Sequence, residues 1–305
     1  MKIARAFSPG HITGFFQICD ESENLLEKGS RGAGVSLCRG VITTVEAKPT
    51  KATKIRIEIN GDASSPAPVS ETVATRFLEC APSPQYDIRI SHQVDLPIGS
   101  GFGTSGAGAL SLALALNQAI GTGLSKLEVA KIAHIAEVQH RTGLGTVISE
   151  LVGGIEIRTA AGAPGIGQVE TLPVNEQYRV MCLHFGPIPT SIHLNNLNSR
   201  KLINERGGLL TDALRASPTV SNFMEYARNF AKHIGIITKR VETVLHEADQ
   251  VGIVCSSAIF GETAFTILPI DQIQDLTRIF ERHQVSGEAL MVMEIDSEGA
   301  RVLDA

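Results

Sequence analysis

The segment Leu96–Gly121, LPIGSGFGTSGAGALSLALALNQAIG, constrains the fold of this chain more than any other. Its first part is crowded with glycines, and from Ser105 onward it is apolar on every face of the helix that its pattern predicts. A helix that is hydrophobic all round belongs in the centre of a domain. The apolar run from Ala107 to Leu116 is well short of the ~20 residues that a membrane span needs. The pattern therefore predicts a buried helix of a soluble protein.

The glycines before this helix predict an anion site. They stand at positions 99, 101, 103, 106 and 108, around the expected helix start. Glycine lets backbone N–H groups approach a ligand without side chains in the way. The first turn of a helix adds unpaired N–H donors and a partial positive charge, a combination that most often binds phosphate. Thr104 and Ser105 supply hydroxyls for phosphate or a metal. A tight turn alone would need only one or two glycines.

Other nucleotide-binding motifs fit less well. Gly101, Gly103 and Gly106 match the dinucleotide fingerprint G-x-G-x-x-G, which requires a strand after the helix. Here a second helix follows, because Ser125 and Glu128 form a capping box at its start. The chain has no G-K-[ST] of a P-loop and lacks the protein-kinase V-A-I-K and D-F-G motifs.

Composition excludes several classes of protein. The chain has 305 residues, of which 43% are hydrophobic and 19% charged, an ordinary globular balance with room for about two domains. Its net charge of −5 and the lack of a long basic stretch argue against nucleic acid as a partner. Five scattered cysteines form neither a disulfide framework nor a metal knuckle, and the N-terminus lacks a signal-peptide core. We expect a cytoplasmic protein that binds neither nucleic acid nor a membrane.

The remaining pattern predicts an α+β chain of two domains. The N-terminal part has predicted strands at 41–47, 54–59, 86–94 and 155–159, and predicted helices at 70–80, from 105 and at 127–140. The Gly/Pro-rich stretch 160–167 is the best boundary, giving domains 1–162 and 163–305. The second domain has predicted strands at 178–184, 251–255, 261–268 and 289–295, with helices between about 198 and 249 and at 271–283.

These motifs resemble those of the GHMP kinase superfamily. Pro97-x-x-x-Gly101-Phe102-Gly103-Thr104-Ser105-Gly106-Ala107 resembles its phosphate loop P-x-x-x-G-L-G-S-S-A-A. Ser8–His11 is similar to the family's A-P-G-K segment, Gly153–Gly154 to its paired glycine and 261–265 to its third motif. The resemblance implies an N-terminal domain like ribosomal S5 domain 2, which binds the nucleotide, and a ferredoxin-like C-terminal domain.

The resemblance also implies the cofactors, ATP and Mg²⁺. The ATP phosphates would be held by the loop residues Pro97, Gly99, Ser100, Gly101, Phe102, Gly103, Thr104, Ser105, Gly106 and Ala107. Ser105 and Glu137 would be the metal ligands and catalytic residues. Glu137 shares a helix stripe with two small residues, Ala130 and Ala133, so that another backbone segment can come close.

Within the superfamily the chain resembles the archaeal pantoate kinases. The resemblance lies in Ser8–Phe16, Gly29–Val35, Thr142–Gly145 and Gly186–Ile188. It implies phosphorylation of the primary hydroxyl of pantoate, on the route to coenzyme A. The alternatives are another GHMP activity, such as homoserine kinase, and a nucleotide-binding regulator without catalysis. A homodimer is the candidate assembly.

The predicted base and acceptor site depart from the superfamily pattern. Thr146 occupies the catalytic position where many members have Asp, and threonine cannot be a general base. We expect a transition state loose enough to need no strong base, with Glu150 as the alternative. The pantoate carboxylate requires a cation, for which Arg31 beside Gly32 is the first choice and His11 the second. Arg158 and Arg141 are further candidates. The histidines lack zinc-site spacing.

Overall fold

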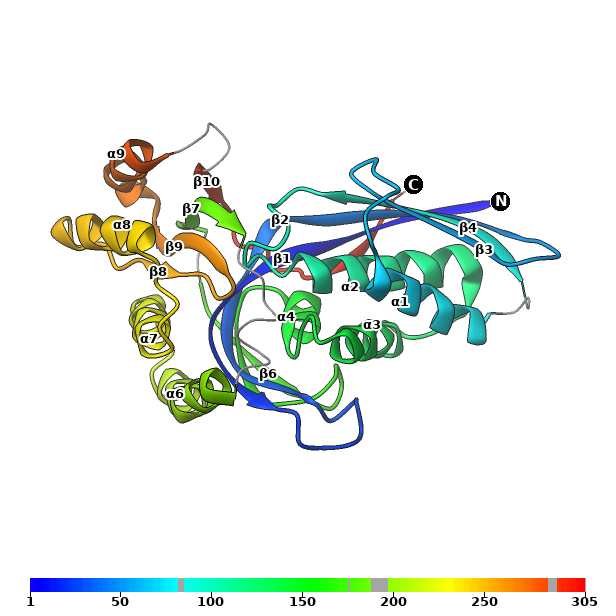
Figure 1. Ribbon diagram of the computed structural model, residues 1–305, viewed down its shortest axis with the longest axis horizontal. Coiled ribbons are helices and arrows are strands. Elements are labelled where there is room, and N and C mark those ends of the chain that lie inside the picture. The colour runs from blue at the N-terminus through cyan, green and yellow to red at the C-terminus, as the bar shows by residue number, and fades with distance from the viewer. Residues whose placement is uncertain (82–84, 175, 188–196, 285–289, 305) are drawn as a thin grey trace.

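The computed structural model describes residues 1–81, 85–174, 176–187, 197–284 and 290–304 (Figure 1). In chain order its elements are β1 (Lys2–Cys19), β2 (Gly29–Pro49), β3 (Lys54–Ile59), α1 (Pro68–Glu79), β4 (Tyr86–Val94), α2 (Thr104–Leu116), η1 (Asn117–Gly121), α3 (Lys126–His140), α4 (Thr146–Val152), β5 (Ile155–Ala160), β6 (Gln168–Leu172), β7 (Tyr178–Pro187), α6 (Leu197–Ala216), α7 (Val220–His233), α8 (Lys239–Gln250), β8 (Ser256–Ser257), β9 (Gly261–Pro269), η2 (Ile270–Gln272), α9 (Ile273–His283), β10 (Leu290–Met293) and β11 (Arg301–Leu303). Ile188 and Ala289, which belong to a predicted motif and a predicted strand, lie outside the described residues.

The larger sheet is built on the long antiparallel pair of β1 and β2. Its order is β11-β1-β2-β4-β3, with β5 paired to β2 and β6 to β5. The sequence pattern predicted only residues 41–47 of the β1–β2 pair, because glycines and Pro9 interrupt the alternation of apolar and polar residues. The pairing of β1 with β2 accommodates these residues by shifting its register at Pro9/Gly10 and at Thr13/Phe15. His11 lies between the two shifts, and such irregularities often re-aim side chains beside active sites.

Helices α1, α2 and α3 pack on one face of this sheet (Figure 1). Ten of the thirteen residues of α2 are buried, which confirms the predicted central helix. The capping box of α3 is also confirmed, since Ser125 accepts from the Glu128 amide and the Glu128 carboxylate accepts from the Ser125 amide. This layer holds the start of α2, and hence the glycine loop, against the sheet.

The smaller sheet has the ferredoxin-like order β10-β7-β9-β8. Its strands and helices follow one another as β-α-β-β-α-β, with α6, α7 and α8 in the first connection and α9 in the second. Helices α8 and α9 bury Val244, Leu245 and Phe280 against it. The predicted α+β architecture is therefore confirmed in both halves.

The predicted strand 251–255 is wrong. Residues 251–252 form a turn, and the strand starts only at Ser256. The amides of Val251 and Ile253 donate to the Ala248 carbonyl, so this segment closes the end of α8. Gly252 supplies the positive φ of 76° that such a helix end needs. A short apolar run directly after a helix can thus close the end of that helix instead of forming a strand.

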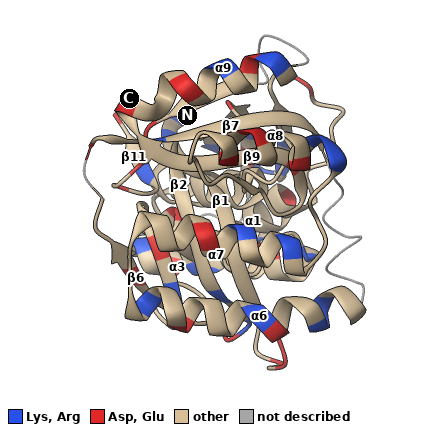
Figure 2. Ribbon diagram, turned by 90° about the vertical axis from the view of Figure 1, so that its left-hand side faces the viewer, with Lys and Arg blue, Asp and Glu red and all other residues tan. Residues whose placement is uncertain are grey.

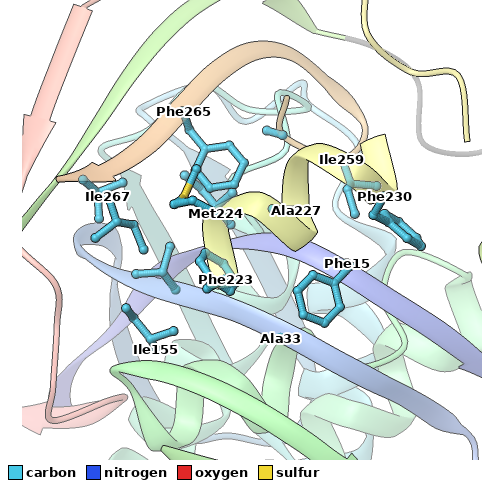
Figure 3. Close-up of a cluster of buried hydrophobic side chains, with 14 of the residues drawn as sticks. Phe15, Ala33, Ile155, Phe223, Met224, Ala227, Phe230, Ile259, Phe265 and Ile267 are labelled. Carbon is cyan, nitrogen blue, oxygen red and sulfur yellow. The ribbon is translucent and has the colours of Figure 1, made fainter. Parts of the chain in front are cut away.

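One apolar core joins the two sheets. Figure 3 shows Phe15, Ala33 and Ile155 of the larger sheet against Phe223 and Met224 of α7, with Phe265 and Ile267 of β9 alongside. Two strands beyond residue 162 also return to the larger sheet, since β6 pairs with β5 and β11 with β1. The boundary between 162 and 163 stays a prediction.

Charged side chains are mixed along the outer helices. Figure 2 shows both basic and acidic residues along α6, α7 and α9. No helix among the described residues has both the length and the apolar character to cross a membrane.

Candidate active site

A cavity of about 410 Å³ lies over the glycine loop. This volume falls in the range usual for small-molecule sites. Its lining has three parts: an apolar part from β3, α1 and β4, the glycine loop, and a polar part from β1, α3, α4 and β5. The residues that carry the argument below are His11, Thr13, Ser30, Pro66, Pro68, Val69, Gly99 to Gly106, Glu137, Thr142, Thr146 and Arg158.

The glycine loop ends in an uncapped helix. Gly101 and Gly103 have φ values of 85° and 64°, in the left-handed region that favours glycine. Gly103 is the N-cap of α2, and no side chain caps that end. The first-turn amides of α2 are therefore available to an anion that enters the cavity, as the sequence predicted.

Close packing around the loop also leaves no room for side chains at several glycine positions. A Cβ atom at Gly106 would lie 2.9 Å from a Glu150 carboxylate oxygen, and one at Gly103 would lie 2.9 Å from the Thr146 methyl group. On the other side, a Cβ at Gly261 would lie 2.0 Å from the Ser100 carbonyl oxygen. The predicted third motif at 261–265 thus packs directly on the glycine loop, across the two halves of the molecule.

Glu137 and Ser105 lie together, as a shared metal site requires. Ser105 Oγ donates to Glu137 Oε1, and Thr142 Oγ1 donates to the same oxygen at 2.7 Å. Glu137 is 2% exposed, and within the described residues no basic side chain pairs with it. Burial raises the pKa of this carboxyl, although the two hydroxyl hydrogen bonds oppose the rise. A buried carboxylate without a counter-charge, at the edge of an anion site, suits a hard cation such as Mg²⁺. The described residues form no cluster of three or more His, Cys, Asp or Glu that could hold a metal.

A buried polar network lies in the other part of the cavity. His11 Nε2 contacts the Glu156 carboxylate at 3.0 Å, and Arg158 Nη1 donates to the same carboxylate and to Ser149 Oγ. Burial alone would raise the pKa of Glu156, but His11 and Arg158 hold it below its ordinary value. Arg158 is 1% exposed, and its Nε has no partner within the described residues. This guanidinium is a preformed but incompletely paired cation in the cavity wall.

Only some of the residues predicted to bind the acceptor line the cavity. His11 lines the cavity, whereas Arg31 and Gly32 are absent from its lining. The Arg31 guanidinium instead donates to the Thr159 carbonyl and Gln17 and pairs with Asp212. Arg141 caps the end of α3 and is not part of the lining either.

Of the ten predicted loop residues, eight line the cavity. They are Gly99, Ser100, Gly101, Phe102, Gly103, Thr104, Ser105 and Gly106. Pro97 and Ala107 do not; Ala107 is fully buried inside α2. Thr146, at the first turn of α4, lines the cavity beside the loop.

Sequence reasoning missed Thr13, Ser30, Thr142 and Glu156. A signal for Glu156 was present in the strand IEIRT, where Glu156 and Arg158 are two residues apart between isoleucines. Residues at this spacing share one face of a strand. Opposite charges on one face of an otherwise apolar strand indicate a buried pair. Thr13, Ser30 and Thr142 had no charge pattern of this kind, although each lies in a segment that carries the resemblance to the archaeal pantoate kinases.

The chain is similar to proteins of one kinase family. The family model for the GHMP kinases N terminal domain matches residues 69–154. The pantoate kinase of Methanocaldococcus jannaschii is 35% identical over 275 residues, covering 90% of this chain and 96% of the relative. That of Thermococcus kodakarensis is 36% identical over 82% of each chain. A solved structure described as a phosphotransferase related to the CoA biosynthesis pathway superimposes with a TM-score of 0.88 at 31% identity, covering 98% of both chains.

Proposed function

The chain belongs to the pantoate kinase family of GHMP kinases, and we propose that it transfers the terminal phosphoryl group of ATP to the primary hydroxyl of pantoate. This is an alcohol phosphotransferase reaction on the route to coenzyme A. The observation that carries the proposal is the single cavity in which an uncapped helix start, a buried carboxylate and a buried guanidinium meet.

The loop and α2 would bind the triphosphate. The first-turn amides of α2 and the backbone around Gly101 and Gly103 supply fixed donors for phosphate oxygens. Pro66, Pro68 and Val69 give the cavity an apolar part suited to the adenine ring. Phosphoryl transfer depends chiefly on positioning and on neutralising charge, which these groups provide.

Ser105 and Glu137 fit Mg²⁺. Their ligand atoms are a hydroxyl and a carboxylate oxygen, the hard donors that this ion prefers. When bound, Mg²⁺ neutralises charge on the phosphates. Ser105 and Thr142 hold the Glu137 carboxylate in place by hydrogen bonds.

Arg158 is the better candidate for the pantoate carboxylate. It lines the cavity, and its Nε has no partner in the part of the chain that the structure describes. Arg31 is instead engaged by Thr159, Gln17 and Asp212 away from the lining. Ser30, whose hydroxyl lies near Gly145 and the Arg158 guanidinium, adds a second donor. A guanidinium binds a carboxylate with planar, paired hydrogen bonds that a lysine cannot reproduce.

Exchanging each arginine for lysine discriminates between these two sites. We expect Arg158→Lys to raise the KM for pantoate by roughly 10- to 100-fold, because the fork of donors is lost. Arg31→Lys should leave that KM within about threefold of wild type. The KM for ATP should change in neither variant, which serves as the control for folding. A larger rise of the KM for pantoate in Arg31→Lys would instead support Arg31, the first choice from the sequence, as the cation that binds the pantoate carboxylate.

An acceptor panel tests the function itself. Purified protein with ATP and Mg²⁺ is incubated with pantoate, homoserine or mevalonate, ADP is followed, and the product is identified by mass spectrometry. We expect turnover of pantoate to 4-phosphopantoate. Turnover of homoserine or mevalonate in its place would refute the substrate while leaving the family intact. ATP binding without turnover of any acceptor would favour a regulator.

We also propose that the protein acts in the cytoplasm. The five cysteines are free thiols in the structure, in keeping with a reducing compartment. A homodimer stays a prediction, to be tested by the mass in solution.

A further inference from the structure

The acceptor hydroxyl loses a proton in the proposed reaction, and the expected positions for a base hold no suitable group. Thr146 has only a hydroxyl. The Glu150 carboxyl is 0% exposed, lies against Gly103 and Gly106, and is not part of the cavity lining. A proton acceptor for this reaction must therefore be sought elsewhere in the cavity wall.

Three side chains from β1 and β5 form a continuous array in that wall. Thr13 Oγ1 lies 3.4 Å from His11 Nδ1, and His11 Nε2 lies 3.0 and 3.1 Å from the two oxygens of Glu156. Thr13 and His11 line the cavity, while Glu156 lies behind them with 0% exposure. A hydroxyl, an imidazole and a buried carboxylate thus follow one another away from the cavity. The first distance is long, but catalytic hydrogen bonds often shorten only when substrate binds.

The surroundings of the ring favour one tautomer. Glu156 also accepts from Arg158 and Ser149, which favours its ionised form, and a carboxylate can only accept a hydrogen bond. His11 Nε2 must then carry a proton and donate it to Glu156. In the neutral ring this leaves the lone pair of Nδ1 facing Thr13. The charged and titratable groups near the ring come from β5, as Glu156 and Arg158, and from α4, where Glu150 approaches Gly103 beside the His11 Cβ. On β2 the ring meets Gly34, which has no side chain.

We propose that Thr13 and His11, with Glu156 as the positioning residue, remove the proton of the acceptor hydroxyl. The proposal rests on the proposed kinase function. As the acceptor oxygen bonds to the γ-phosphorus, the bond from that phosphorus to the bridging oxygen breaks, and its electron pair leaves with ADP. The acceptor proton passes to Thr13 Oγ1 while the Thr13 proton passes to His11 Nδ1. The resulting imidazolium is stabilised by Glu156 and later releases one proton to water.

The tautomer can be tested without any turnover. Long-range ¹H–¹⁵N NMR spectra of the whole protein at neutral pH, with the His11 signals assigned through His11→Gln, report which ring nitrogen carries the proton. We expect a protonated Nε2 and a bare Nδ1. A proton on Nδ1, or on both nitrogens, would overturn the proposal whether or not pantoate is the substrate.

A matched pair of variants tests the relay. Thr13→Val keeps the shape of the side chain and removes its hydroxyl, whereas Thr13→Ser keeps the hydroxyl. We expect kcat to fall about 100-fold in Thr13→Val and in His11→Gln, within the range for acid–base catalysis, and to change little in Thr13→Ser. The glutamine amide can still donate to Glu156, so the fold is preserved, and ATP affinity measured by calorimetry should match wild type.

Two outcomes separate this proposal from the proposed function. If wild type phosphorylates another acceptor in place of pantoate, the same variants are measured with that acceptor, and only the substrate assignment is lost. If Thr13→Val retains wild-type kcat while binding ATP normally, the relay is refuted and the kinase function stands.

Discussion

Glu150 shows how strongly the surroundings of one side chain determine its chemistry. Neither carboxylate oxygen has a hydrogen-bond partner within the described residues, and the side chain is fully buried. Burial, followed by the charges of Glu137 and Glu156, raises its pKa well above the ordinary value. A carboxyl that already holds a proton is a poor acceptor, which argues against the alternative in which Glu150 is the base.

Glu150→Gln should make the protein more stable at high pH. The pKa of Glu150 is higher in the folded than in the unfolded chain, so the folded state binds more protons between these two values. Wild-type stability then falls as pH rises through that window, whereas the glutamine cannot ionise. We expect the variant to gain stability relative to wild type as pH rises above the range in which an ordinary carboxyl ionises. Urea unfolding at several pH values measures the difference, and parallel pH curves for the two proteins would contradict it.

Ser105→Ala and Glu137→Gln should lower kcat by roughly 100-fold each, because each would remove a ligand of the proposed Mg²⁺ site. The double variant should lose little more than either single one, since under the proposal the two groups hold the same ion. Initial rates at saturating ATP and several Mg²⁺ concentrations provide the measurement. Wild-type rates at ordinary Mg²⁺ would remove both residues from the metal site.

Among the elements, the two ends of α3 have different roles: its first turn contributes to stability, and its last turns contribute to the cavity. Its first turn is held by the Ser125–Glu128 capping box, and its last turns present Glu137 to the cavity. The box was predicted from four residues because capping depends on neighbours within one turn. The position of Glu137 opposite Ser105 depends instead on how α3 packs against α2.

Ser125→Ala should therefore destabilise the protein without impairing catalysis. Loss of the cap should cost about 1 kcal/mol in the free energy of unfolding. The value of kcat should stay within about twofold of wild type, since Glu137 lies near the opposite end of the helix. Denaturant unfolding and steady-state rates on one preparation test both statements. A fall in kcat without a fall in stability would show that this end of α3 contributes to the site.

For the molecule as a whole, the shared core implies that the two halves fold together. Phe15 and Ile155 of the larger sheet pack in one cluster with Phe223 and Phe265 of the C-terminal half. The last strand, β11, returns to pair with β1, and Arg301 stacks over Phe7 at 4.7 Å. A large apolar interface of this kind couples the stability of the two halves.

A fragment ending at residue 162 should fail to fold. It lacks β6, β11 and the apolar partners of Phe15 and Ile155, so it would expose a large part of its core. The full chain should unfold in one transition by circular dichroism and by tyrosine fluorescence. Dispersed NMR signals from the fragment would instead support an independent N-terminal domain.

The chain's local patterns were sufficient for the central helix, the glycine loop before it, the α3 cap and the α+β class. Each of these depends on residues within a few positions of one another, where glycine conformation, capping and apolar spacing act directly. The register of β1 and β2, the cap that replaced strand 251–255, and the different placements of Arg158 and Arg31 required the folded molecule. His11 and Glu156 are 145 residues apart, and their contact exists only because β1, β2 and β5 are neighbours in one sheet. Burial and charge at such a contact are set by distant segments, so no spacing within either strand could have revealed them.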